Sequence, residues 1–125
     1  MAAKVWIGWG LCGLVIAFLL LDGVMKVIAP SFVLEAGELI GFPGVAMSRG
    51  LGLLLLACAL LYIVPRTSVV GAILVTAYLG GAVATHVRLG HPLFSHVLFG
   101  VYVGILMWGG LALRSPDLLA ILLRD

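Results

Sequence analysis

The sequence predicts an all-α membrane protein, an up-and-down bundle of four transmembrane helices, and two observations carry this prediction. Hydrophobic residues make up 64% of the 125 residues and charged residues only 10%, with a mean hydropathy of +1.32, which lies outside the range of soluble domains. The apolar residues also form continuous runs instead of alternating with polar ones. Because lipid cannot hydrogen-bond the backbone, such runs are expected to be helices.

The length of the chain limits what else it can contain. A bilayer-spanning helix needs about 20 mostly apolar residues, so four spans with short connections occupy nearly all of residues 1–125 as a single integral-membrane domain. The net charge of +2 comes from few residues, and no basic patch with interleaved aromatic residues indicates nucleic-acid binding. The expected spans are residues 5–28, 45–64, 68–87 and 94–113.

The first span follows Lys4 and ends before Pro30, which cannot continue a helix. A lysine ahead of a long apolar run is also typical of a signal peptide. However, Asp22 and Lys26 replace the small residues of a cleavage site, so we expect a retained helix. These two residues are four apart and share a helical face, in the acid-before-base order that favours an ion pair.

Residues 31–44 are too short and too charged to cross a membrane. We expect a short interfacial helix here, with Ser31 as its cap and Gly41 as its end, lying between the first two spans. Glu35 and Glu38 are expected to be solvated charges rather than catalytic groups.

The second span carries Arg49 near its start and ends before Pro65. The third span contains small residues at every fourth position, which are expected to permit close helix approach. The fourth span begins after Pro92 and contains a Gly-x-x-x-Gly packing element, and residues 114–124 form a short amphipathic tail. The small residues are Ala77, Gly81 and Thr85 in the third span and Gly100 and Gly104 in the fourth.

The distribution of basic residues predicts the orientation. With four spans, both termini lie on one side of the membrane. That side holds Lys4, Arg66, Arg114 and Arg124, whereas Arg88 is the clearly extra-helical basic residue of the other side. The positive-inside rule therefore predicts a protein of the cell (inner) membrane with both termini in the cytoplasm.

Nearly all other ionisable residues fall at the extracytoplasmic ends of the four spans, which an antiparallel bundle brings to one membrane face. We expect Asp22, Arg49, His86 and His96 to form an acid-base site there. Arg49 would hold an oxygen atom, His86 would give or take a proton, and Asp22 would orient them or balance their charge. The expected ligand-binding residues around this site are Lys26, Tyr78, Thr85, Arg88 and Tyr102.

This constellation suits a lipophilic, oxygen-bearing molecule that enters from the bilayer, such as a quinone. Proton-coupled or oxidoreductase-associated chemistry is the leading hypothesis, and the reaction class stays open. One alternative is a redox-free acid-base enzyme, an isomerase, cyclase or epoxide-opening hydrolase acting on a terpenoid or lipid. Another alternative is an accessory subunit, an assembly factor or a homodimer that packs its Gly100 and Gly104 face on a partner. In a third alternative, the polar groups only anchor the bundle at the lipid headgroups.

No metal site is predicted. His86, His91 and His96 are five residues apart, which does not match the spacing of two ligands on one helical face, and no attachment motif indicates haem. Cys12 and Cys58 are isolated, so we expect them to be packing residues rather than a redox pair.

Several short segments resemble the DoxX-like family of small four-helix membrane proteins. They are Asp22-Gly-Val-Met-Lys26, Gly41-Phe-Pro43, Arg49-Gly-Leu-Gly52 and Gly81-Ala-Val-Ala-Thr-His-Val-Arg-Leu-Gly90, and the resemblance covers residues 8–113. It implies a four-helix bundle. Relatives named for the small subunit of a thiosulfate:quinone oxidoreductase also imply a quinone-type ligand, but no sulfur-oxidising residue carries over because the chain has no paired cysteines.

Overall fold

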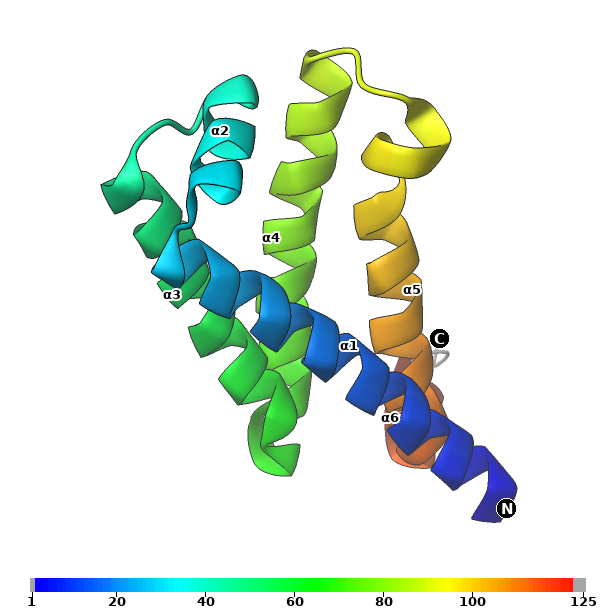
Figure 1. Cartoon of the computed structure of the whole chain (residues 1–125). Coiled ribbons are helices and arrows are strands. Elements are labelled where there is room, and N and C mark those ends of the chain that lie inside the picture. The colour runs from blue at the N-terminus through cyan, green and yellow to red at the C-terminus, as the bar shows by residue number, and fades with distance from the viewer. Residues whose placement is uncertain (1, 123–125) are drawn as a thin grey trace.

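The computed structural model describes residues 2–122, apart from the side chains of residues 2, 96, 116, 119 and 122, and all its regular elements are helical (Figure 1). In this described part of the chain, four helices are long and apolar enough to cross a membrane, and their bounds lie within a few residues of the expected spans. The helices are α1 (Ala2–Ile28), α2 (Ser31–Leu39), α3 (Val45–Ile63), α4 (Ser68–Arg88), α5 (Phe99–Arg114) and α6 (Pro116–Leu122).

The fourth span differs from the expected single helix. It begins with one π-helical turn, η2 (Leu93–Val97), and continues as α5. The turn follows Pro92, whose carbonyl oxygen accepts a hydrogen bond from the backbone N–H of Val97 at 3.1 Å. Such wide turns are rare and often occur at functional sites.

The four long helices form a ring in which α1 and α4 stand at opposite corners. Helix α1 packs against α3 and α5, and α4 packs against the same two helices from the other side. Figure 1 shows α1 crossing α3 and α5 obliquely, with the start of α1 and the end of α5 at the same end of the bundle. This arrangement is consistent with the predicted up-and-down topology.

The core occupies the half of the bundle nearer the chain ends. Tyr62 is fully buried, and its hydroxyl donates to the carbonyl oxygen of Met107 at 2.9 Å and contacts Cys12 Sγ at 3.1 Å. Cys12 and Cys58 are both buried and free, as expected for packing residues. The other core residues are Val15, Leu19, Leu55, Ala59, Ala72, Val75, Leu79, Val103 and Leu111.

Helices α1 and α3 cross closely at a pair of glycines near the opposite end. A Cβ atom added to Gly52 would lie 2.7 Å from the carbonyl oxygen of Gly23 and 2.8 Å from Lys26 Cβ. Such a contact is far shorter than van der Waals packing permits, so only glycine fits there. The crossing therefore fixes the turn of α1 that carries Lys26.

Helix α1 ends at Ile28, where Ala29 adopts a left-handed conformation with φ of +56° and redirects the chain. Helix α2 follows as the predicted short segment, with Glu35 and Glu38 exposed. The predicted cap differs: Ser31 is the first helical residue, Pro30 occupies the capping position, and no side chain caps the helix.

Candidate functional site

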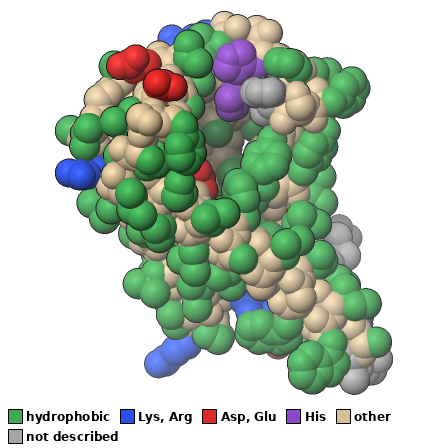
Figure 2. All heavy atoms as spheres, in the orientation of Figure 1, with side chains coloured by type: hydrophobic (Ala, Val, Ile, Leu, Met, Phe, Trp, Pro, Cys, Tyr) green, Lys and Arg blue, Asp and Glu red, His purple; other side chains and the backbone are tan. Residues whose placement is uncertain are grey.

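A cavity of about 580 Å³ lies between α1, α4 and the start of α5, and the turn between α2 and α3 reaches its edge. Figure 2 shows the hollow, with histidine side chains near it, on an otherwise largely apolar face. Its apolar lining includes Phe18, Phe42, Leu51, Leu79 and Phe99. Its polar and charged lining residues are Asp22, Lys26, Tyr78, Thr85, His86 and Ser95.

Small residues of α4 create this space. Ala77, Gly81 and Ala82 all line the cavity, and a Cβ atom added to Gly81 would meet no atom within 4 Å. The expected role of Ala77, Gly81 and Thr85 in close helix approach is therefore wrong, because all three line open volume. The close approach of α4 and α5 occurs at Gly100, where an added Cβ would lie 3.2 Å from the carbonyl oxygen of Leu79.

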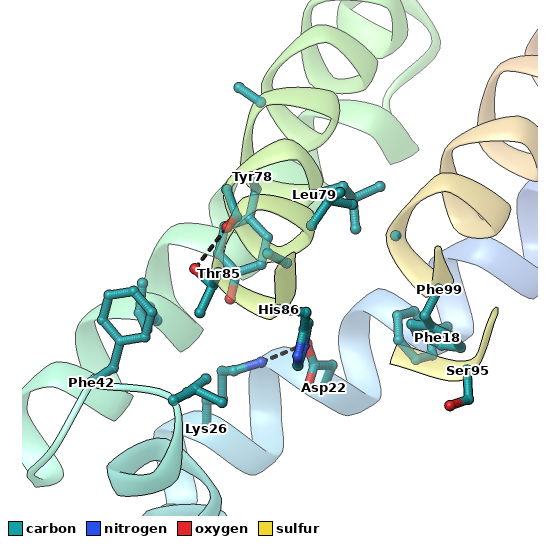
Figure 3. A pocket seen from close by; sticks show the side chains of 17 residues that line it. Phe18, Asp22, Lys26, Phe42, Tyr78, Leu79, Thr85, His86, Ser95 and Phe99 are labelled. Atoms are coloured by element: carbon teal, nitrogen blue, oxygen red, sulfur yellow. Dashed lines mark hydrogen bonds and ion pairs between the residues drawn. The ribbon is translucent and has the colours of Figure 1, made fainter. Parts of the chain in front are cut away.

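An ion pair lies in the cavity wall. Lys26 Nζ is 2.7 Å from Asp22 Oδ2, and the two side chains are 25% and 34% exposed. Figure 3 shows both side chains reaching from α1 into the cavity, toward His86 of α4. Lys26 Nζ also lies 6.0 Å from the ring centroid of Tyr78. Apolar surroundings strengthen the attraction between the two charges and make either charge costly without the other.

The second polar feature is a pair of histidines at the end of α4. His86 Nδ1 and His91 Nδ1 are 2.6 Å apart, and the backbone N–H of His91 donates to the carbonyl oxygen of His86 at 3.1 Å. Two Nδ1 atoms at this distance share one proton, so one ring donates and the other accepts. This contact helps to orient the His86 ring in the cavity wall.

The sequence prediction omitted two polar residues: Ser95, which lines the cavity, and His91, which lies behind the lining against His86. The place of His91 depends on Gly90, which adopts φ of +70° and turns the chain back over the last turn of α4. A glycine directly after a helix is the usual residue for this left-handed conformation. Gly90 in the sequence could therefore have indicated that His91 returns toward His86.

Arg49 does not line the cavity. It is exposed, and its Nε donates to the carbonyl oxygen of Val27 at 3.0 Å, while Ser48 Oγ donates to the carbonyl oxygen of Lys26 at 2.8 Å. The last carbonyl groups of a helix have no partner within it. Arg49 and Ser48 therefore donate to carbonyl groups at the C-terminal end of α1 that would otherwise have no partner. The prediction that Arg49 points into the cavity is wrong for this reason.

Two of the predicted ligand-binding residues, Tyr102 and Arg88, also lie away from the cavity. Tyr102 is exposed and donates to the carbonyl oxygen of Phe94 at 3.0 Å. Arg88 is exposed, with its guanidinium beside Gly41 in the turn that follows α2. Thr85 does line the cavity, but its hydroxyl donates to the carbonyl oxygen of Gly81 at 2.8 Å. His96 belongs to η2, and its side chain lies outside the part of the structure that is described.

We expect Arg49→Ala to weaken the bundle without emptying the cavity. The change removes a charged hydrogen bond at the C-terminal end of α1, which at an exposed position contributes about 0.5–1 kcal/mol. Thermal unfolding in detergent measures this loss, with Arg66→Ala, an exposed arginine far from α1's end, as the control. Loss of a co-purified ligand from Arg49→Ala at unchanged stability would instead restore Arg49 to the binding site.

Within the described residues, no three histidine, cysteine, aspartate or glutamate side chains gather closely enough to hold a metal ion. The lining of the cavity includes three side chains that carry N–H or O–H groups, those of Lys26, Tyr78 and His86.

The fold and the cavity together define a polytopic membrane protein, a four-helix bundle with a mostly apolar cavity that carries a few charged and polar groups in one half of its span. A comparison with protein families matches residues 10–110 to the DoxX-like family, and the chain belongs to that family. No curated protein and no solved structure is significantly similar to it.

Proposed function

We propose that this protein binds a lipophilic, oxygen-bearing molecule of the quinone type in the cavity and carries out proton-coupled chemistry on it. The observation that supports this proposal most directly is the Lys26–Asp22 ion pair, 2.7 Å long, in the wall of a cavity of about 580 Å³ that is otherwise mostly apolar. Ligand sites commonly combine an apolar wall with a few convergent polar groups. Ionisable groups within a membrane span are functional candidates by default.

In this proposal, Lys26 takes the role that the sequence prediction gave to Arg49. The Lys26 ammonium, held by Asp22, donates to a carbonyl oxygen of the ligand, and His86 donates to or accepts from the same region. The Lys26 ammonium stabilises negative charge that develops on the oxygen, as does His86 when it donates, and this stabilisation is larger in an apolar cavity than in water. Asp22 balances the charge of Lys26 and holds its direction.

The distribution of basic residues supports an orientation. Lys4, Arg66 and Arg114 belong to one end of the bundle, and the cavity lies in the other half. We propose that both termini lie in the cytoplasm and the cavity in the outer leaflet of the inner membrane, which the positive-inside rule favours when Lys26 and Arg49 are counted with the spans and Arg88 alone remains at the other end. In that position, a lipophilic ligand can reach the cavity from the bilayer.

Filling the cavity tests the proposal. Gly81→Leu places a large side chain in the open volume, so we expect the protein to lose the lipophilic molecules that co-purify with the wild type, as measured by mass spectrometry of extracted lipids. Gly13→Leu is the matched control, because Gly13 is also exposed on a long helix and an added Cβ meets no atom within 4 Å. Equal amounts of every molecule in both variants would refute binding in the cavity.

A redox-free acid-base reaction on a terpenoid or lipid is the second candidate. The short His86–His91 contact favours it, because a histidine pair that shares a proton can serve as an acid or a base. Substrate conversion in liposomes that contain no quinone or other electron carrier would identify this activity. The accessory-subunit alternative receives less support, since Gly100 already packs on α4 within this chain.

A further inference from the structure

The histidine pair connects the cavity with the exposed end of the bundle. His86 lines the cavity, whereas His91 lies outside the lining and follows Gly90, an exposed residue of the turn after α4. Both histidines are half-buried, and Figure 2 shows histidine side chains beside the hollow, close to the end of the bundle. Orienting the His86 ring does not require a second imidazole, since any small side chain that forms a hydrogen bond could do so. The presence of a second imidazole therefore points to a role beyond orientation.

The geometry of the pair suits the transfer of a proton from one ring to the other. The two Nδ1 atoms are 2.6 Å apart, and the ring centroids of His86 and His91 are 4.9 Å apart with their planes at 43°. This distance between nitrogen atoms lies in the range across which side chains exchange protons. A neutral imidazole has one nitrogen that donates and one that accepts, and it binds or releases a proton near neutral pH. A proton that binds to one ring can therefore be released from the other.

The backbone holds the two rings in register. Gly90 turns the chain with φ of +70°, and its N–H donates to the carbonyl oxygen of Val87 at 3.1 Å. The N–H of His91 donates to the carbonyl oxygen of His86, also at 3.1 Å. Because these bonds involve only backbone atoms, we expect them to persist when the His91 side chain is replaced by another of similar shape.

The charged groups around the pair do not oppose a positive charge on it. Lys26 and Asp22 reach from α1 toward His86, and they neutralise one another at 2.7 Å (Figure 3). The guanidinium of Arg88 lies beside the turn that follows α2. The element η2 also packs against α4 and includes His96, whose side chain lies outside the described part of the structure. A proton on the histidine pair therefore faces no unbalanced cation from α1.

We propose that His91 and His86 form a proton relay between water at this end of the bundle and the ligand's oxygen atom in the cavity. The inference rests on the proposed function and specifies the route of its protons. In the resting pair, Nδ1–H of His91 donates to Nδ1 of His86. A proton from water binds to Nε2 of His91, the Nδ1 proton passes to His86, and the Nε2 proton of His86 passes to the ligand. One proton enters, one leaves, and no electron moves; release of a proton from the ligand reverses these steps and restores the starting tautomers.

A coloured acidic probe tests the relay. Lawsone is a hydroxylated naphthoquinone whose absorbance changes when its hydroxyl group ionises. The protein in nanodiscs is saturated with lawsone and mixed rapidly with buffer of lower pH, and the change in absorbance gives the rate at which the bound probe is protonated. The rate at which lawsone leaves the protein, measured by transfer to empty nanodiscs, shows whether protonation precedes release.

His91→Asn separates the relay from orientation. The asparagine amide nitrogen takes the place of the imidazole Nδ1 and can hold the His86 ring, but an amide does not bind a proton near neutral pH. We expect lawsone affinity to stay within about threefold of the wild type, while protonation of the bound probe slows roughly tenfold or more. Imidazole in solution should restore the rate in His91→Ala, where it can occupy the vacated space, but not in His91→Asn. Leu89→Ala, an exposed and uncharged change at the same helix end, should leave affinity and rate unchanged.

Two kinetic results would overturn the relay and leave the cavity's function intact. One is an unchanged protonation rate in His91→Asn, because protons would then reach the ligand directly from water or from the Lys26–Asp22 pair. The other is equal slowing in Leu89→Ala. If His91→Asn does not bind lawsone, a failure of imidazole to restore the rate in His91→Ala overturns the relay instead. Failure of lawsone to bind the wild type would overturn the proposed quinone-type function, and the relay with it.

Discussion

Asp22→Asn is expected to lower the free energy of unfolding by about 1–3 kcal/mol. The change removes the partner of Lys26 and leaves its ammonium in an apolar cavity wall. Breaking a fully buried pair costs more, but the 25% and 34% exposure of these two side chains reduces the effect through partial hydration. Unfolding of the purified protein in detergent measures the loss.

The double variant Lys26→Met with Asp22→Leu separates stability from function. Replacing both charges with apolar side chains of similar volume removes the desolvation cost of each, so the double variant should be as stable as the wild type or more so. It should nevertheless lose the co-purified ligand, because no charged donor remains in the cavity. A double variant that is stable and still holds the ligand at the wild-type level would show that the pair only anchors α1.

The sequence contains most of the fold. The apolar runs, Pro30, Pro65 and Pro92 place the four spans and the breaks between them, because a membrane leaves the backbone few alternatives to helices. The π-helical turn could not be predicted in the same way. It depends on hydrogen bonds from Val97 and Leu98 to carbonyl groups five residues earlier, and no residue type specifies that spacing.

The site was harder to predict, because a residue's place at the end of a helix does not determine where its side chain points. Asp22, Lys26 and His86 do line one cavity, as their shared end of the bundle suggested. Arg49 comes from the same end of the bundle, but its side chain donates to a carbonyl group at the end of α1 instead of lining the cavity. Whether a side chain donates to the end of a neighbouring helix depends on where the two helices cross. The packing of Gly23 on Gly52 sets that crossing here.

The roles of the small residues in the membrane helices were the hardest to predict from the sequence. A small residue in a membrane helix permits close contact with a neighbouring helix, but it also leaves volume where no helix is close. Gly100 illustrates the first outcome and Gly81 the second, although the two occur in similar apolar surroundings in the sequence. Only the tertiary arrangement distinguishes a contact glycine from a cavity glycine.

His86→Ala is expected to weaken ligand binding roughly tenfold to a hundredfold. The change removes a ring that lines the cavity beside the Lys26–Asp22 pair, and a hydrogen bond to a polarised oxygen in apolar surroundings is worth about 1.5–3 kcal/mol. The loss is measured with menadione, a naphthoquinone without a tail, as a decrease in the thermal stabilisation of the protein in nanodiscs. Arg88→Ala, an exposed change two residues further along α4, should leave binding unchanged.

His91→Ala distinguishes a direct role of His86 from an orienting role of its neighbour. His91 holds the His86 ring through the 2.6 Å contact between the two Nδ1 atoms but lies outside the cavity lining. Its removal should therefore weaken binding by a smaller factor, roughly threefold to tenfold, because the His86 ring remains but loses one contact that orients it. A larger effect from His91→Ala than from His86→Ala would assign ligand contact to His91, and an equal absence of effect in both would remove the histidine pair from the site.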